Sequence, residues 1–181
     1  MASSEVARWI STVLRGGSIV KSEDIEKVVD LMLGAVDMDG RKYILNALLS
    51  TKSTQILHTF MESRGPVIFR TWIAEARKDI SSAQCEEILL KTIDVLMSLP
   101  FDVERLKDTQ IGKAIKLLAS DKRGSQELAR KASELKDKWL KLISDDDSVS
   151  SPLPSTYTYE NPRKRPRFDI PAAPAEIQQV E

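Results

Sequence analysis

Few side chains in this sequence have the chemistry of a catalytic or metal-binding site. His58 is the single histidine, and it stands among polar neighbours in a segment whose apolar residues have helical spacing, so we expect it on the surface rather than acting as a base. Cys85 is the single cysteine and has no identifiable partner for nucleophilic chemistry or for metal binding. The segment from Asp37 to Gly40 begins like a calcium loop, but Leu48 stands where the closing glutamate is required. We therefore expect no enzyme activity, no cofactor and no metal.

Composition and charge are those of an ordinary globular protein. The 27 basic and 27 acidic residues balance to a net charge of zero, so nothing draws the chain as a whole towards nucleic acid or a membrane surface. A single cysteine forms no internal disulfide, which favours a reducing compartment. No apolar run approaches the ~20 residues of a membrane span, and residues 1–17 lack the apolar block of a signal peptide. We expect the protein to stay inside the cell.

Hydrophobic residues recur at steps of three and four along most of residues 1–143, and nowhere do they alternate over strand lengths. The pattern predicts an all-α bundle of about eight helices and no sheet. Turn residues separate the helices, as at Asp39-Gly40 and Gly65-Pro66, and Ser81 and Gln84 have the spacing of a capping box. The expected helices cover residues 4–14, 23–33, 43–49, 55–64, 66–76, 82–99, 110–120 and 126–143.

The last two predicted helices form the most distinctive part of the sequence. A short turn at Asp121 to Gly124 joins them, so we expect antiparallel neighbours. The second helix carries a single apolar stripe that includes Trp139, and Trp72 lies in a similar stripe earlier in the chain. Each tryptophan is expected to bury a large area in the core rather than to bind a ligand. The stripe comprises Leu128, Ala132, Leu135, Trp139 and Leu142.

This hairpin carries a family resemblance. The run LPFDVERLKDTQIGKAIKLLA, followed after a polar turn by ELARKASELKDKWLKLI, resembles the N-terminal domain of transcription elongation factor S-II (TFIIS), also called the LW domain. Upstream, ILNALLSTKS and GPVIFRTWI are most similar to the version of this domain in nuclear targeting subunits of type-1 protein phosphatase (PNUTS-like proteins). The resemblance covers about residues 41–143 and implies a helical bundle. The matching positions are Pro100, Val103, Leu106, Ile111, Gly112, Lys113, Ile115, Leu118, Leu135 and Trp139.

The resemblance and the composition together predict three segments. We expect residues 1–40 to be an N-terminal helical extension packed on the bundle, and residues 41–143 to be the bundle itself. Residues 144–181, rich in proline, serine and charge, are expected to be a disordered tail. A basic cluster in this tail has the composition of a nuclear import signal and, with the nuclear family resemblance, predicts a nuclear protein. The cluster comprises Arg163, Lys164, Arg165 and Arg167.

The resemblance also implies a mode of binding. Domains of this family, and the similar integrase-binding domain of the chromatin tether LEDGF, bind disordered segments in which acidic residues precede bulky apolar ones. The implied surface lies at one end of the bundle and is formed by interhelical loops. Phe101 is either a lid on the core or an exposed anchor, and the sequence leaves both open, while Lys107 and Lys113 would steer the acidic part of a peptide. The expected loop contacts are Leu49, Thr51, Lys52, Phe101 and Val103.

Charge distribution leaves a second class of function open. Residues 103–143 contain eleven lysines and arginines against six acidic residues, whereas residues 1–102 contain twelve against fourteen. This basic hairpin would attract an acidic peptide or nucleic acid, but it lacks the interleaved aromatics of most nucleic-acid readers. We therefore expect a nuclear scaffold or adaptor for linear motifs of transcription-elongation, RNA-processing or 3′-end-processing factors, linked by the resemblance to a type-1 phosphatase complex. The alternatives are RNA or DNA binding through the hairpin, and a structural subunit that docks or dimerises through Trp9.

Overall fold

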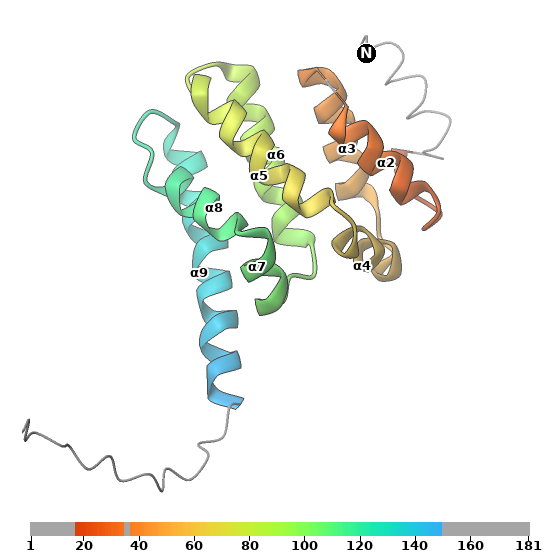
Figure 1. Ribbon diagram of the computed structural model, residues 1–181. Helices are drawn as coiled ribbons and strands as arrows, with labels where there is room; N and C mark the ends of the chain where they lie inside the picture. The colour runs from red at the N-terminus through yellow and green to blue at the C-terminus, as the bar shows by residue number, and fades with distance from the viewer. Residues whose placement is uncertain (1–16, 35–36, 150–181) are drawn as a thin grey trace, which may run out of the picture. The chain divides into compact units, whose positions relative to one another are not determined.

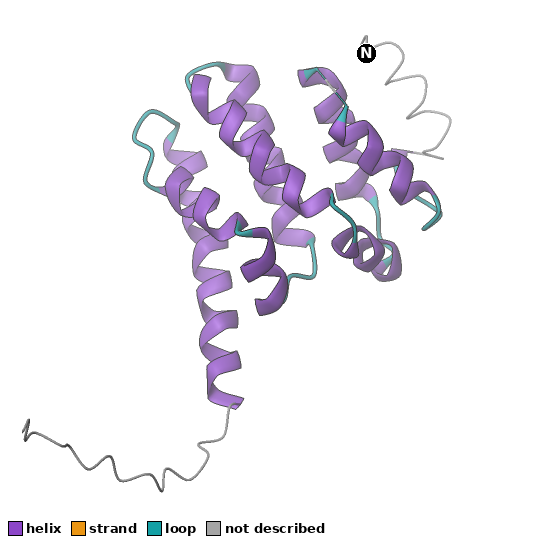
Figure 2. Cartoon of the chain, in the orientation of Figure 1, coloured by secondary structure: helices purple, strands orange, loops and turns teal. Residues whose placement is uncertain are grey.

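The computed structural model of this chain describes residues 17–34 and 37–149. All regular secondary structure in these residues is helical, without any strand, which confirms the predicted all-α fold (Figures 1 and 2). The helix predicted at residues 4–14, with Trp9, lies outside the described residues. The elements are α2 (Asp24–Leu33), α3 (Met38–Ser50), α4 (Thr54–Glu62), α5 (Gly65–Ala76), the short 3₁₀-helix η2 (Arg77–Asp79), α6 (Ala83–Ser98), α7 (Val103–Thr109), α8 (Ile111–Ala119) and α9 (Gln126–Val149).

Helix α5 is the central element of the bundle (Figure 1). It packs against α2, α4, α6, α7 and α8, while α3 packs on α6, and α9 packs on both α6 and α8. One hydrophobic core results, which extends from Ile19, before α2, to Trp139 on α9. The buried side chains of α2 belong to this same core, so the hydrophobic effect that stabilises the bundle also holds α2 in place.

Trp72 and Trp139 are both buried, with exposed fractions of 3 % and 4 %. The Trp72 indole meets the Phe69 ring edge to face, with ring centroids 5.9 Å apart, and Phe69 lies 5.8 Å from Phe60. The guanidinium of Arg41 lies 5.1 Å from the centre of the Trp72 ring. Aromatic pairs of this geometry stabilise a core beyond the area that they bury.

Helix α3 begins at Met38, which shows that the turn predicted at Asp39-Gly40 is wrong. The carboxylate of Asp37 accepts a hydrogen bond from the backbone N–H of Gly40 at 2.9 Å, and this bond satisfies one of the free donors at the helix start. A residue pair that is typical of a turn therefore lies in the first turn of a helix, because the aspartate before it is the N-cap.

The boundary between α4 and α5 lies where Gly65-Pro66 predicted it. A Cβ atom at Gly65 would lie 2.3 Å from two carbons of the Phe60 ring, which is fully buried, so this position has no room for a side chain. Pro66 fits the first turn because its missing N–H is not needed there. At the start of α6 the predicted capping box is wrong: the N-cap is Ser82, and its side chain makes no capping hydrogen bond.

Helix α7 is an element that the hydrophobic pattern did not predict. The Asp102 carboxylate accepts a hydrogen bond from the backbone N–H of Arg105 at 2.7 Å and so caps the helix. Gln110, in the left-handed conformation with φ of 52°, then separates α7 from α8. Left-handed backbone usually signals glycine or asparagine, and a glutamine gives no such signal. Val103 is therefore the first residue of a helix and not part of a loop.

Helix α9 continues to Val149, past the tail boundary expected at Ser144. The Ser144 hydroxyl donates a hydrogen bond to the carbonyl of Leu140 at 2.9 Å, and no proline or glycine interrupts the chain before Pro152. The rest of the expected tail, including the basic cluster at residues 163–167, lies outside the described residues. Within the described ranges, none of the helices has the length and hydropathy needed to cross a bilayer.

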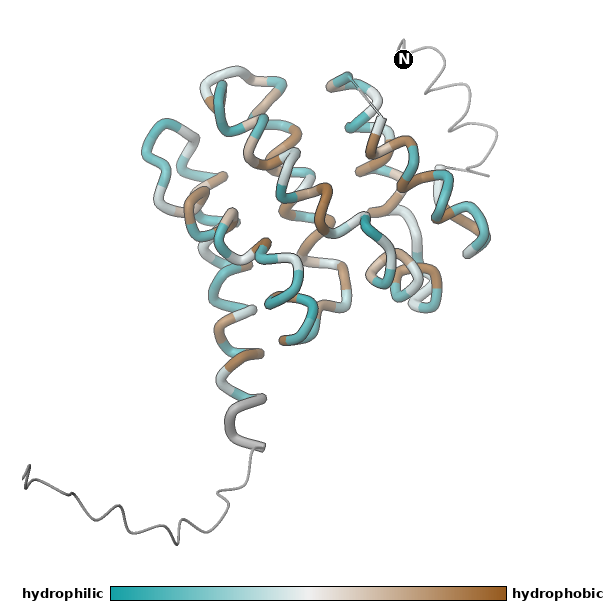
Figure 3. The backbone as a smooth tube through the Cα atoms, viewed as in Figure 1, coloured by the Kyte–Doolittle hydropathy of each residue, from teal (hydrophilic) through white to brown (hydrophobic). Residues whose placement is uncertain are grey.

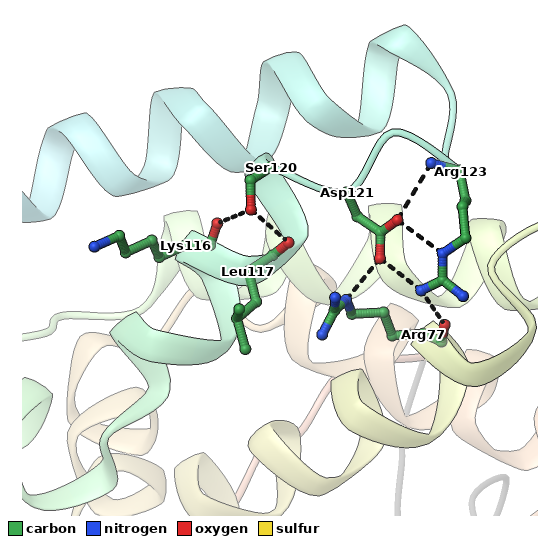
Figure 4. A network of polar contacts seen from close by, with 6 residues as sticks. All are labelled: Arg77, Lys116, Leu117, Ser120, Asp121 and Arg123. Atoms are coloured by element: carbon green, nitrogen blue, oxygen red, sulfur yellow. Dashed lines mark hydrogen bonds and ion pairs between the residues drawn. The ribbon is translucent and has the colours of Figure 1, made fainter.

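The turn between α8 and α9 is held by a network of charged side chains (Figure 4). The Asp121 carboxylate accepts hydrogen bonds from Arg77 Nε at 2.8 Å and from Arg123 Nη2 at 2.7 Å, and Arg123 Nη2 also donates to the Arg77 carbonyl at 3.3 Å. The hydrogen bonds from Arg123, helped by that from Arg77, hold the pKa of Asp121 well below its ordinary value. The turn is thereby attached to η2.

Candidate functional site

Trp139, on α9, lines two concave surfaces, one towards the α6–α7 loop and the other towards α7 and α8. Its indole is buried, but its edges line a hollow on each side. On one side the Phe101 ring packs against it, with ring centroids 5.1 Å apart and planes at 59°. The two hollows share this tryptophan as a wall, so its position sets the shape of both.

The first hollow, the aromatic cleft, has a volume of about 900 Å³ and lies between the α6–α7 loop and α9. The side chains of Phe101, Trp139 and Leu142 form much of its apolar lining. Charges of both signs surround it in equal number, and Arg130 and Glu134 pair with each other at 3.4 Å. The charged residues are Arg130, Lys138, Lys141, Glu134, Asp137 and Asp145.

Phe101 combines the two roles that the sequence left open. Its ring is half-buried against Trp139, as in a lid, and it also lines the open cleft, as in an anchor. Its backbone N–H donates to the carbonyl of Leu99 at 3.0 Å, and Lys138 Nζ donates to the carbonyl of Met97 at 2.8 Å. The first bond lies within the α6–α7 loop, and the second ties the last turn of α6 to α9, so the loop that carries Phe101 begins at a helix end fixed beside α9.

The second hollow, the lysine groove, has a volume of about 570 Å³ and lies between α7, α8 and the second half of α9. Leu106, Trp139, Leu140 and Ile143 supply its apolar surface, with Gln110 and Gly112 beside them. Leu140 is 52 % exposed and Ile143 36 % exposed. Figure 3 shows hydrophobic stretches on this part of α9. The cations that line the groove are Lys107, Lys113, Lys116 and Lys136.

The four lysines of this groove are weakly compensated. No aspartate or glutamate lines the groove. Lys113 Nζ donates to Gln110 Oε1 at 3.4 Å, and Lys136 lies 3.3 Å from the carboxylate of its neighbour Asp137. Lys107 and Lys116 make no ion pair within the described part of the chain. Positive charge of one sign beside apolar surface is complementary to a ligand that is both acidic and apolar.

The structure places Thr51 and Lys52 in the loop between α3 and α4, whereas Leu49 lies in the last turn of α3, so its prediction as a loop residue is wrong. Thr51 is buried, and its hydroxyl donates to the Ala47 carbonyl at 2.8 Å and accepts from the Ile19 N–H at 3.1 Å. Leu49 is half-buried against the core, whereas Lys52 is exposed. Of these three residues, only Lys52 offers its polar group to a partner.

Both predicted loops lie at the same end of the bundle. Helices α3 and α6 are parallel neighbours, because Lys42 pairs with Glu87 at 2.6 Å and, one turn later in both helices, Lys91 bonds to Asn46 at 3.0 Å. Their C-terminal ends therefore point the same way, as Figure 1 shows. The α3–α4 loop and the α6–α7 loop follow these ends directly.

The structure divides the predicted site in two. Phe101 lines the aromatic cleft, whereas Lys107 and Lys113 line the lysine groove on the other side of Trp139. Val103 is 9 % exposed and packs into the bundle. Sequence reasoning missed Lys116, Lys136, Leu140 and Ile143, although the last two are apolar residues beside the core stripe of α9 and were visible as such.

The described residues offer no metal-binding constellation. They contain no group of three histidine, cysteine, aspartate or glutamate side chains that could hold a metal ion. His58 is exposed on α4, and Cys85 is buried on α6. What the arrangement does provide is concave apolar surface with nearby charge, which is suited to binding.

Comparison with known proteins finds a family model that matches the hairpin. Residues 90–143 match the family model described as the TFIIS helical bundle-like domain (Med26). The chain is similar to serine/threonine-protein phosphatase 1 regulatory subunit 10 of Sus scrofa, at 30 % identity over 146 residues and 80 % of this chain. The similar subunits of Xenopus laevis and Rattus norvegicus are 28 % and 27 % identical over 80 % and 77 % of this chain. The matched part spans only 15 % to 17 % of the length of these relatives.

Proposed function

Because residues 90–143 belong to the TFIIS helical bundle-like domain family, we propose that this chain is a non-enzymatic adaptor whose bundle binds short acidic segments with bulky apolar residues. The partners we propose are disordered segments of transcription-elongation, RNA-processing or 3′-end-processing factors. The nucleus is the proposed compartment, with the basic cluster at residues 163–167 as the import signal.

The single observation that supports this function best is the aromatic cleft. Phe101 packs on Trp139 at an open apolar hollow, on a loop that has an internal backbone hydrogen bond and follows an α6 end tied to α9. A supported aromatic beside a concave apolar surface is typical of an anchor for one bulky partner side chain, and such central aromatics often contribute about 2 kcal/mol or more to binding. Lys52, exposed at the same end of the bundle, would meet an acidic residue of the same segment.

The relatives support a proposed link to a type-1 phosphatase complex. The proteins to which the chain is similar are named as regulatory subunits of phosphatase 1, and the chain matches only a small part of their length. We propose that the bundle supplies the partner-recruiting part of such a regulatory subunit. In that role it would bring a bound transcription or processing factor near the phosphatase and would not itself contact the phosphatase active site.

An NMR titration of the full chain tests this function. The probe is a short acidic peptide that contains one phenylalanine, and the control peptide has alanine in its place. We expect the phenylalanine peptide to shift signals of the loops around Lys52 and Phe101, and the alanine peptide to bind much more weakly. The proposal fails if both peptides bind equally, or if neither shifts these loops.

A parallel titration with single-stranded RNA separates the peptide-binding function from nucleic-acid binding. Affinity for RNA falls by orders of magnitude as salt rises, because binding releases counterions, whereas an anchored phenylalanine is far less sensitive. If only RNA shifts the signals of the chain, and only at low salt, the domain is a nucleic-acid binder and the adaptor function is wrong.

A further inference from the structure

The lysine groove has chemistry that the aromatic cleft lacks, and nothing in the proposed function uses it. Its lining is mainly apolar, yet every charged group on it is a lysine. The two exposed aliphatic residues, Leu140 and Ile143, lie in the second half of α9 and line the groove together with Leu106 of α7. Contact between apolar surface and water is unfavourable. A partner that covers this surface therefore gains binding free energy from its burial.

Geometry indicates the shape of the partner. Lys136, Leu140 and Ile143 follow one another at steps of four and three along α9, so they form a straight stripe about two turns long on one face. Gly112, on α8, faces the same groove, and a Cβ added there would have no heavy atom within 4 Å. A straight apolar stripe with open space beside it is suited to a second helix that packs along α9.

Charge indicates the composition of that helix. Lys107, Lys113 and Lys116 line the α7 and α8 side of the groove, and Lys136 lies on the α9 side. A helix that lies between them would have cations on both flanks, so acidic side chains on both flanks of its apolar face would be complementary. Nucleic acid is a poorer match, because no arginine lines the groove and its only aromatic side chain, Trp139, is 4 % exposed.

We propose that the lysine groove is a second docking face, separate from the aromatic cleft, which takes an acidic amphipathic helix from a partner protein. The apolar face of that helix would cover Leu140 and Ile143, and its flanking carboxylates would meet the four lysines. This inference goes beyond the proposed function, since it holds whether or not Phe101 anchors a motif.

The binding test uses the full chain and a synthetic probe. The probe is a glutamate-rich helical peptide with leucines at i, i+4 and i+7, and the control peptide has the same composition with the leucines spread around the helix. We expect the probe to bind at least about tenfold more tightly than the control, as judged by fluorescence anisotropy, because only the probe has a continuous apolar face. Equal binding of both peptides would mean that charge alone attracts them, and the proposal would be overturned.

Variants locate the binding site. Gly112→Leu fills the open space beside the stripe, and Lys113→Glu with Lys136→Glu reverses half of the rim charge; each should weaken probe binding by about tenfold or more. The matched charge control is Lys78→Glu with Lys122→Glu, two exposed lysines outside the groove, which should change the affinity less than twofold. Leu140→Asp, at an exposed position where folding is not at stake, serves as a further blocking variant that should weaken the probe similarly.

The outcomes also separate this inference from the proposed function. Phe101→Ala should leave probe binding unchanged, and Gly112→Leu should leave binding of the phenylalanine peptide unchanged. If Phe101→Ala abolishes probe binding, or if Gly112→Leu and Leu140→Asp both bind the probe like the wild type, the groove is not the docking face. Competition of single-stranded RNA for the probe site, together with equal binding of the control peptide, would identify nucleic acid as the occupant instead.

Discussion

The aromatic cleft and the lysine groove share one wall, the indole of Trp139, but they differ in charge and in construction. Three basic and three acidic residues surround the cleft, and some of them pair, whereas the groove carries lysines alone. The chain as a whole has no net charge. The comparison teaches that a chain with no net charge can still have a strongly positive surface, because the fold determines which charged side chains lie side by side.

The two surfaces are also held in different ways. The cleft depends on the α6–α7 loop, which follows the end of α6 that Lys138 ties to α9 through the carbonyl of Met97. The groove depends on the packing of α8 against α9, and Asp121 holds the turn between them. A change at Trp139 should therefore damage both surfaces, whereas changes at the loop or at the turn should affect one more than the other.

The largest effect is expected when the shared wall is removed. Trp139→Ala should lower the free energy of unfolding by about 3 to 5 kcal/mol, because it leaves a cavity between α9 and the core. Chemical denaturation measures this loss, and both probe peptides should bind the variant more weakly. Tyr43→Ala, at a half-exposed aromatic on α3, is the control and should change stability much less. An unchanged midpoint for Trp139→Ala would contradict the view that this residue supports both surfaces.

Phe101→Ala should separate the two surfaces most clearly. It should weaken binding of the phenylalanine peptide by about 2 kcal/mol, since that peptide loses its aromatic contact. Binding of the leucine probe should stay the same, because Phe101 does not line the lysine groove. Isothermal titration calorimetry with each peptide measures both affinities. A loss for both peptides of equal size would show that cleft and groove act as one site.

Acid should lower the stability of the fold by protonating Asp121, which holds the turn between α8 and α9. The pKa of this carboxyl is held below its ordinary value of 3.8, so the charged form stabilises the fold at all pH values above 3.8. As the pH falls below 3.8 towards the depressed pKa, protonation removes this contribution. Asp121→Asn should therefore lower the urea midpoint at neutral pH, by less than Trp139→Ala does, and the difference from wild type should shrink in acid.

The control for this pH experiment is Asp108→Asn, since Asp108 makes no ion pair in the described residues. Its urea midpoint at neutral pH should stay close to that of the wild type. At neutral pH, Asp121→Asn should also weaken the leucine probe more than the phenylalanine peptide, because the turn positions α8 against α9. A difference between Asp121→Asn and wild type that grows as the pH falls below 3.8 would contradict the assigned direction of the pKa.

The smallest effect is expected at Gly112, where alanine should stabilise the chain. A Cβ there meets no neighbour, and alanine in a helix is favoured over glycine by about 0.5 to 1 kcal/mol. Gly65→Ala is the contrasting variant, since its Cβ would overlap the buried Phe60 ring and should destabilise the fold. Thermal melts compare the two. If Gly112→Ala also destabilises, the space beside the stripe is not open, and the groove is shallower than described.

The sequence predicts the helical class, the position of the α8–α9 hairpin and the Gly65-Pro66 boundary. Each of these rests on hydrophobic periodicity or on residues that are typical of a helix boundary. Helix α7 could not be predicted, since a left-handed glutamine at position 110 has no signature. The start of α3 was misplaced because Asp37 acts as a cap only when the chain after it is helical. At positions such as Gln110 and Asp37, tertiary packing determines where a helix begins or ends.

The candidate site shows the same division between what spacing reveals and what packing decides. The sequence drew attention to Phe101, Lys107 and Lys113, yet only the fold shows that Trp139 stands between the first and the other two. It also offered Thr51 as a contact, whereas the hydroxyl of that residue is engaged by Ala47 and Ile19. The sequence shows which side chains lie near a loop, but only the three-dimensional structure shows that one tryptophan lines two surfaces.

The continuation of α9 to Val149 makes this helix a spacer between Trp139 and the chain that follows. A helix rises about 1.5 Å per residue, so the chain after Val149 starts about 15 Å beyond Trp139 along the helix axis. Any segment attached there starts at that distance from the wall that the two surfaces share, and its local concentration at each surface depends on the length of chain that must fold back. The length of α9 thus sets how long an attached segment must be before it can reach these surfaces and compete with a partner.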